Sequence, residues 1–290
     1  MKYYILFNPL SGNESCEKQM ESLAIDKTAK TVYYNILEND GYKNLFLNVS
    51  PQDRIIICGG DGTLNRFVNE IDDLEVKNEI LYFGTGSGND FLHDLGIHTT
   101  TKPIVINDYI KNLPVVNIKG KDYRFLNGIG IGIDGFVCAE GNRLRAKNNK
   151  KINYTWVALK ALLWQYKPLN AKVTIDGITK QYKKVWLVPS MKGKFFGGGM
   201  KIAPMQNRFS ENGEITSIVA HDLSRFRILW IFPKIFKGTH VKYTKYLDIK
   251  KCHEIKVEFD RPCDLQIDGE PINDVKEYTL TAKKNVVYGK

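Results

Sequence analysis

The chain has 290 residues, of which 43% are hydrophobic and 11% aromatic, and 42 Lys and Arg against 32 Asp and Glu give it a formal net charge of +10. This amount of apolar side chain excludes disorder as the main state, and the length suffices for one or two hydrophobic cores. No apolar run approaches the roughly 18 residues that a membrane-spanning helix requires.

The first 115 residues alternate short apolar runs with longer mixed segments. Strands are predicted at residues 3–7, 30–34, 54–58 and 80–83, and helical spacing at 14–24 and 64–71. The strands carry Ile, Tyr and Phe on both sides of the pleat, which indicates burial on both faces, as in a parallel sheet covered by helices. An α/β domain is therefore predicted over residues 1–117.

After about residue 118 the pattern becomes mostly β and predicts a sandwich over residues 118–277. Its strands are predicted at 124–126, 171–175, 184–188, 214–219, 254–259 and 264–267, and its helices at 154–166 and 224–237. Residues 278–290 are expected to form a C-terminal strand or tail, and the sequence allows it to return to the first domain.

The charge is divided unevenly between these two parts. Residues 1–117 hold 10 Lys and Arg against 16 Asp and Glu, a balance of −6, whereas residues 118–290 hold 32 against 16, a balance of +16. A basic surface of this kind favours an anionic partner, and nucleic acid, anionic lipid and phosphorylated small molecules all qualify.

The first ten residues lack the pattern of a signal peptide, and the five cysteines form no CxxC pair or framework spacing. We therefore expect reduced thiols and a cytoplasmic location.

Three glycine-containing loops follow predicted strands. Gly59, Gly60 and Gly62 connect one strand to a helix that Thr63 is expected to cap; the other loops are 7–12 and 82–91. A single loop of this type is equally well explained as an ordinary turn. In a parallel sheet, however, all three would meet at the carboxyl edge, where backbone N–H groups and a helix N-terminus can bind phosphate.

Asp61 stands in the middle of the first of these loops. A carboxylate repels phosphate, so this position indicates either a screening metal ion or a proton-handling role.

At these residues the sequence resembles the diacylglycerol kinase catalytic family, the bacterial lipid kinases related to sphingosine kinases. The likeness rests on Asn8-Pro9 with Ser11-Gly12, on 59–65 with Asn69, and on Gly84-Thr85 with Asn89-Asp90-Phe91; it continues through 125–134, 197–204 and 266–270. The match runs in order along nearly the whole chain.

The resemblance implies a two-domain enzyme with its active site in the interdomain cleft, which transfers the γ-phosphoryl group of Mg-ATP to a lipid hydroxyl, with diacylglycerol as the first expectation. Asp61 and Asp90 would hold Mg²⁺ directly or through water. The catalytic set would be Glu270 as base, Asp61 as the alternative base, and Asp268. The nucleotide would be held by Asn8, Pro9, Ser11, Gly12, Gly59, Gly60, Gly62, Thr63, Leu64, Asn65, Gly84, Thr85, Gly86 and Asn89.

Three positions depart from the family pattern. Asn117 stands where the family often has Asp, and the second glycine loop is one residue longer than usual. The family also has an Asp-Gly pair that can bind a structural cation with nearby carbonyls. Here Asn212 replaces that Asp, so a site made of Phe209, Asn212 and Glu214 should bind a cation weakly, if at all.

Two basic segments are candidates for a membrane surface. Residues 224–237 combine aromatic residues with four cations, which suits a lipid headgroup layer, although packing of an apolar stripe on the sandwich is the favoured interpretation. Residues 143–151 are expected to be a solvated loop, with a docking patch as the alternative. A peripheral enzyme at an anionic membrane surface is the resulting expectation, and a homodimer stays open.

Two other functions compete with this hypothesis. NAD kinases share a Gly-Gly-Asp-Gly-Thr loop and a similar two-domain plan. A basic nucleic-acid-binding protein without enzymatic activity would explain the +16 half, but it leaves the three phosphate loops unexplained, so nucleic acid is not the expected partner.

Overall fold

A computed structural model describes residues 1–11, 16–26, 28–38, 42–72, 74–86, 88–98, 102–148 and 152–283. The chain divides into two compact units, Met1–Lys111 and Asn112–Lys290. The boundary expected at residue 117 falls inside a strand that belongs to the second unit. Residues 112–117 carry no charge, so the balances of −6 and +16 apply unchanged to the two units.

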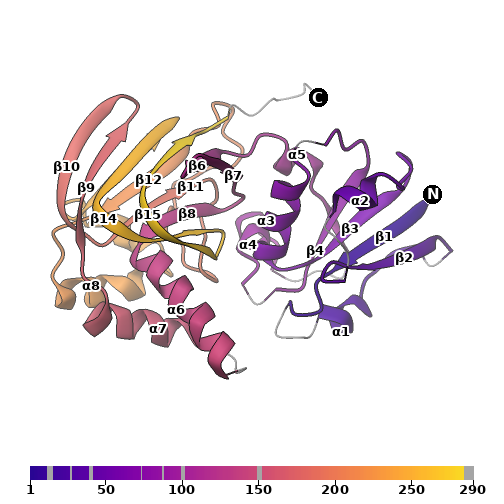
Figure 1. The fold of residues 1–290 in the computed structure, drawn as a ribbon, viewed down its shortest axis with the longest axis horizontal. Helices are drawn as coiled ribbons and strands as arrows, with labels where there is room; N and C mark the ends of the chain where they lie inside the picture. The colour runs from indigo at the N-terminus through magenta and orange to yellow at the C-terminus, as the bar shows by residue number, and fades with distance from the viewer. Residues whose placement is uncertain are drawn as a thin grey trace. The chain divides into compact units, whose positions relative to one another are not determined.

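The first unit is built on one five-stranded sheet with the order β2-β1-β3-β4-β5 (Figure 1). Its strands are β1 (Lys2–Phe7), β2 (Lys30–Asn35), β3 (Arg54–Gly59), β4 (Glu79–Gly84) and β5 (Ile104–Val105). The first four are parallel, and β5 runs antiparallel to β4. The interior positions of β1, β3 and β4 are all buried, which confirms the expectation of strands covered on both faces.

Five short helices complete the described part of this unit: α1 (Cys16–Met20), α2 (Lys43–Phe46), α3 (Asp61–Glu70), α4 (Asp90–Asp94) and α5 (Asn107–Ile110). Helix α3 begins three residues before the predicted start at residue 64, so Asp61 lies in its first turn. The helix expected at 14–24 is confined to Cys16–Met20, and residues 14 and 15 lie outside the described part of the chain.

The second unit holds a ten-stranded sheet whose strand pairs are all antiparallel. Its main path is β13-β12-β11-β8-β14-β15-β6-β7, and β9 joins β10 to β14. The strands are β6 (Val115–Ile118), β7 (Lys121–Arg124), β8 (Gly128–Gly132), β9 (Leu169–Ile175), β10 (Ile178–Val185), β11 (Leu187–Met191), β12 (Ile215–Ala220), β13 (Leu247–Cys252), β14 (Glu254–Ile267) and β15 (Glu270–Thr281).

Strand β14 bends this sheet back on itself. Its first half pairs with β9 and its second half with β8, and its pairing with β15 shifts register on both sides of Cys263. Such irregularities increase local twist and let a long hairpin serve two layers. Ile131, Val173 and Val219 accordingly belong to one buried cluster, so the sheet encloses a core between its layers, as the sandwich prediction requires.

Two predicted strands, 254–259 and 264–267, are halves of β14, and residues 278–281 end β15. Thr279 to Thr281 pair with β6 of the same unit. The end of the chain expected at 278–290 therefore stays with the second unit through residue 283, and residues 284–290 lie outside the described range.

A helical layer covers part of this sheet. It consists of α6 (Ile133–Asn148), α7 (Tyr154–Lys160), the π-helical turn η1 (Ala161–Gln165), α8 (Arg225–Ile231) and the 3-10 turns η2 (Phe232–Lys234) and η3 (Thr239–Lys242). The two predicted helices are confirmed, but the loop expected at 143–151 is wrong for residues 143–148, which end α6. No helix within the described residues combines the length and apolar character needed to cross a membrane.

Candidate functional site: three loops at a sheet edge and an Asp-Gly-Glu turn

The loop after β3 leads directly into α3. Gly60 is the N-cap residue, with φ −92° and ψ −175°, and the helix starts at Asp61. The prediction that Thr63 caps the helix is wrong, because Thr63 lies within the first turn. The N–H groups of a first helical turn have no partner within the helix and carry the positive end of its dipole, so this end of α3 suits an anion.

The second glycine loop packs against this one at backbone level. A Cβ atom built on Gly86 would lie 2.5 Å from Cα of Gly60, so no larger residue fits at position 86 without a shift. The N–H of Thr85 donates to the carbonyl of Gly59 over 2.9 Å. Two of the three predicted phosphate loops therefore touch, at the ends of β3 and β4.

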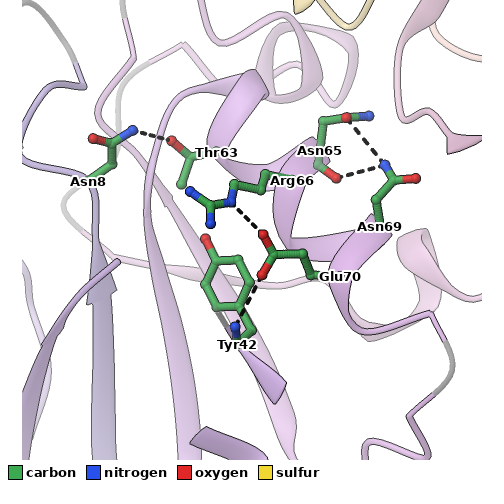
Figure 2. A network of polar contacts seen from close by, with 7 residues as sticks. All are labelled: Asn8, Tyr42, Thr63, Asn65, Arg66, Asn69 and Glu70. Carbon is green, nitrogen blue, oxygen red and sulfur yellow. Dashed lines mark hydrogen bonds and ion pairs between the residues drawn. The ribbon is translucent and has the colours of Figure 1, made fainter. Parts of the chain in front are cut away.

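The loop after β1 joins the same edge. Figure 2 shows the amide Nδ2 of Asn8 donating to Oγ1 of Thr63, over 3.3 Å. Oγ of Ser11 lies 3.6 Å from the position that a Cβ on Gly60 would take. Pro9 is part of the same described turn, whereas Gly12 lies outside the described residues. Strand β1 stands between β2 and β3, so these loops meet where the strand order reverses, the usual position of ligands in such sheets.

Asp61 ties α3 to the start of α4. Its Oδ2 accepts from the N–H of Asp90 over 2.8 Å and its Oδ1 from the N–H of Phe91 over 3.0 Å. Asn89 adopts left-handed backbone angles and exchanges two hydrogen bonds with Gly86 through its side-chain amide. The carboxylate thus fixes the second loop relative to the first, a role that the sequence did not reveal.

Three of the expected nucleotide residues are held by the fold itself. Leu64 is fully buried and its N–H donates to the carbonyl of Gly60. Asn65 is buried, and Asn69 donates to both its backbone carbonyl and its side-chain oxygen (Figure 2). Thr85 is fully buried with its hydroxyl donating to Sγ of Cys16. These contacts hold the three residues within the fold, and their part in nucleotide binding stays a prediction.

The Asp-Gly-Glu turn belongs to the second unit and joins β14 to β15. The carboxylate of Asp268 accepts three backbone N–H groups, from Leu126 over 2.6 Å and from Asn127 and Gly128 over 2.9 Å each. These three hydrogen bonds hold the turn to strand β8 and to the two residues before it. Glu270 follows two residues later and is exposed.

Sequence reasoning missed a pair of buried cations beside this turn. The Arg208 guanidinium donates to the carbonyl of Leu126 over 2.9 Å and to Oδ1 of Asn127 over 3.0 Å. Lys192 is also buried, and burial together with the neighbouring Arg208 lowers the pKa of Lys192 to about 8. The sequence does offer one signal for this pair: Lys192 directly follows an apolar strand and has no acidic neighbour in the sequence.

A buried carboxyl group lies at the start of α6. Burial raises the pKa of Asp134 to about 7, although hydrogen bonds from the N–H of Gly135 and from Gln266 oppose the shift. The sequence shows this residue only as the last position of the 125–134 motif.

The expected structural cation site is already partly satisfied by side-chain donors. The carbonyl of Asn212 lies 3.0 Å from Nε2 of His253, and the carbonyl of Glu214 accepts from Nε2 of Gln206 over 2.9 Å. Asn212 brings no formal charge, and the carbonyl of Glu214 already accepts from Gln206, so these residues do not fit a tightly bound cation.

For the glycine loops the chemistry of the donor set does fit a hydrated cation. The Asp61 carboxylate reaches from the first loop to the start of α4, where the buried Asp90 lies, so two Asp residues stand at the same pair of loops. Carboxylate oxygens and water are the ligands that Mg²⁺ prefers. No cluster of three or more His, Cys, Asp or Glu side chains that could hold a metal occurs within the described ranges.

The comparisons with known proteins match both units. A family model for the diacylglycerol kinase catalytic domain matches residues 2–115, and a model described as the YegS C-terminal NAD kinase beta sandwich-like domain matches residues 127–282. The chain belongs to the diacylglycerol kinase catalytic family. The resemblance and the fold class expected from the sequence are thereby confirmed.

Curated members of the diacylglycerol kinase family are similar along most of the chain. A diacylglycerol kinase of Mycobacterium tuberculosis is 26% identical over 253 residues, covering 83% of this chain and 80% of that protein. A diacylglycerol kinase of Bacillus subtilis is 22% identical over 279 residues, covering 92% and 88%. The crystal structure of a diacylglycerol kinase from Bacillus anthracis superposes with a TM-score of 0.67 at 20% identity, covering 98% and 94%, which shows that the fold is shared.

Proposed function

We propose that this protein is an ATP-dependent lipid kinase that phosphorylates a lipid alcohol, with diacylglycerol as the substrate. The observation that carries the proposal is the convergence of three loops at the ends of β1, β3 and β4, where Gly60 and Gly86 pack backbone to backbone. Family membership supplies the reaction class, and the similarity to diacylglycerol kinases of two bacteria supports the lipid.

The nucleotide phosphates would bind to the first turn of α3 and to the backbone of the loops around Gly60 and Gly86. Backbone N–H groups can bind phosphate even though the first unit has a net negative charge. Asn8 and Ser11 line the same edge and would add side-chain donors.

Mg²⁺ would be held by Asp61 and Asp90, with water between ion and carboxylate where a backbone N–H already occupies one lone pair. When bound, the ion neutralises charge that develops on the transferred phosphoryl group.

Glu270 would orient the lipid hydroxyl and accept its proton. Asp61 is the alternative base, but both of its oxygens already hold the start of α4, whereas Glu270 is exposed at the end of a rigid turn. Asp268 would fix the turn that presents Glu270, through the three N–H groups it accepts.

The deciding assay supplies labelled ATP and Mg²⁺ with diacylglycerol, sphingosine, ceramide or NAD. Label in the diacylglycerol product supports the proposal. NAD is included because NAD kinases share the Gly-Gly-Asp-Gly-Thr loop of residues 59–63. Label transferred to NAD alone would overturn the lipid assignment.

Glu270→Gln should lower kcat at least about 100-fold if Glu270 is the base. Glu277→Gln is the matched control, because Glu277 is an exposed Glu on the same strand β15, where it pairs with Lys256. Equal activity of the two variants would remove Glu270 from the catalytic set.

Asp61→Asn should abolish activity and also cost about 1–2 kcal/mol of stability, because a neutral amide has one acceptor for the two N–H groups at the start of α4. Thermal unfolding measured beside activity separates the two effects. An active Asp61→Asn enzyme would exclude Asp61 from both proposed roles.

The enzyme would work in the cytoplasm at the surface of a membrane, where a lipid substrate is found. The +16 balance of the second unit supports an anionic surface.

A further inference from the structure

Three of the four tryptophans of the chain are exposed, and all three lie in the helical layer of the second unit. Trp156 is 61% exposed, Trp164 68% and Trp230 60%, and Phe226, four residues before Trp230, is 86% exposed, whereas Trp186 is buried. We call Trp156, Trp164, Phe226 and Trp230 the aromatic face. Large aromatic side chains gathered in water mark an interaction surface, because folding normally buries them.

The helices that carry the aromatic face pack against each other and against the sheet. In Figure 1, α7 and α8 lie side by side beneath the strands. The Arg225 guanidinium of α8 donates to the carbonyls of Leu162 and Tyr166 in and after η1. Leu162 and Ile231 are buried in one cluster with residues of the sheet. The inner side of these helices therefore packs on the sheet, and the exposed aromatic residues lie on the side that faces solvent.

The spacing of the aromatic residues places each pair on one side of its own helical segment. Phe226 and Trp230 are four residues apart on α8, and Trp156 and Trp164 are separated by two such steps along α7 and η1. Packing explains the buried and half-buried apolar residues of 224–237, but it does not explain the exposed Phe226, Trp230 and Phe236.

The two segments that carry the aromatic face hold only positive charges. Residues 154–167 and 224–245 contain eight Lys and Arg and no Asp or Glu. Lys234 places its ammonium group 3.7 Å from the centre of the Trp230 ring, so a cation and an indole share one patch of surface. Exposed indoles with surrounding cations are the composition of a segment that lies in the headgroup layer of an anionic membrane.

We infer that the aromatic face docks this protein on anionic lipid bilayers, with the indoles in the interface and the lysines and arginines on lipid phosphates. This deepens the proposed function, because it names the surface through which a lipid kinase would reach its substrate, and it rests on that function only for its purpose. The docking itself requires neither ATP nor turnover. The purely cationic composition disfavours a second copy of the face as the occupant, because two such surfaces repel.

The test measures binding of the full-length protein to vesicles of phosphatidylcholine with and without phosphatidylglycerol, by cosedimentation and by tryptophan emission, in the absence of ATP. We expect binding that depends on phosphatidylglycerol and a blue shift of emission, because three of four indoles would enter the interface. Phe226→Ser combined with Trp230→Ser should weaken binding at least about ten-fold, since each loses interfacial apolar surface.

Ile178→Ser is the matched control. Ile178 is also a highly exposed apolar residue of the second unit, and it is the first residue of β10. The seven-residue strand β9 and a hairpin turn separate it from the helical segment that precedes β9. It should bind vesicles like the wild type. Near-ultraviolet circular dichroism of the buried Trp186 shows whether each variant is folded.

The inference would be overturned if the double variant bound vesicles as tightly as the wild type. It would also be overturned if the wild type bound equally well to vesicles without phosphatidylglycerol. A loss of vesicle binding on addition of RNA at stoichiometric amounts, or self-association through the aromatic face in sedimentation without lipid, would overturn it as well. Activity on diacylglycerol in non-ionic micelles is measured in parallel: docking without activity leaves this inference standing and removes the kinase proposal, and activity without docking does the reverse.

Discussion

Two aspartates of the family motifs accept hydrogen bonds from backbone N–H groups. Asp61 holds the N–H groups of Asp90 and Phe91, and Asp268 holds those of Leu126, Asn127 and Gly128. In each case a carboxylate from one motif fixes the loop of another motif. Substitution of either residue therefore disturbs geometry as well as chemistry, and activity alone cannot assign its role.

Asp134 makes the stability of the protein depend on pH. Its folded pKa of about 7 lies above the ordinary value of 3.8, so the folded state retains a proton that the unfolded state releases between these values. The favourable contribution is complete below pH 3.8 and is lost as pH rises through 7. At about 1.4 kcal/mol for each pKa unit, the loss reaches up to about 4 kcal/mol.

Asp134→Asn should therefore flatten the fall in unfolding free energy between about pH 4 and pH 7 and make the variant more stable than the wild type at pH 8. Urea unfolding at several pH values measures both effects. A variant with the wild-type slope would show that Asp134 does not titrate in this range.

At the scale of elements, the strands of the first unit were predictable and helix α6 was not. Strands β1, β3 and β4 are buried on both faces, so their continuous apolar runs predict them as central strands of a covered sheet. Helix α6 contains Gly135 and Gly141, which lower helix propensity. A Cβ on Gly135 would clash with the carbonyl oxygen of Asp264, so this glycine allows the close packing of α6 on β14. Tertiary contact overrides propensity here, and no local pattern reveals it.

The candidate site was predictable as a set of loops but not as a set of contacts. The spacing of glycines after strands placed Gly60 and Gly86 at one sheet edge. It did not show that Asn8 reaches Thr63, or that Leu64 and Thr85 face inward, because these depend on the angle at which each loop leaves its strand.

The packing of the two glycine loops gives a graded prediction. Gly86→Ala places a Cβ 2.5 Å from Cα of Gly60, whereas Gly60→Ala places one 3.2 Å from Cα of Gly86. Both substitutions push the two loops apart, and Gly86→Ala must push them further than Gly60→Ala. We expect KM for ATP to rise about ten-fold or more for Gly86→Ala and less for Gly60→Ala, because misplaced phosphate donors lose binding steeply with distance. The reverse order would show that the nucleotide does not depend on this contact.

The division of charge separates two kinds of binding at the scale of the whole molecule. The first unit, at −6, would hold a nucleotide of the same sign through backbone N–H groups and a cation, at short range. The second unit, at +16, would meet an anionic membrane through many exposed Lys and Arg. Interactions between exposed charges are screened by salt, whereas hydrogen bonds within a loop cradle are screened much less.

Raising NaCl from about 50 mM to about 300 mM should therefore affect the two partners differently. Salt at this level shortens the range of exposed charge interactions to less than about 8 Å, so binding to vesicles that contain phosphatidylglycerol should fall about ten-fold or more. KM for ATP, measured with diacylglycerol in non-ionic micelles at constant free Mg²⁺, should change less than about three-fold. Equal salt dependence of the two quantities would mean that the basic surface also holds the nucleotide, and the separation of roles between the units would fail.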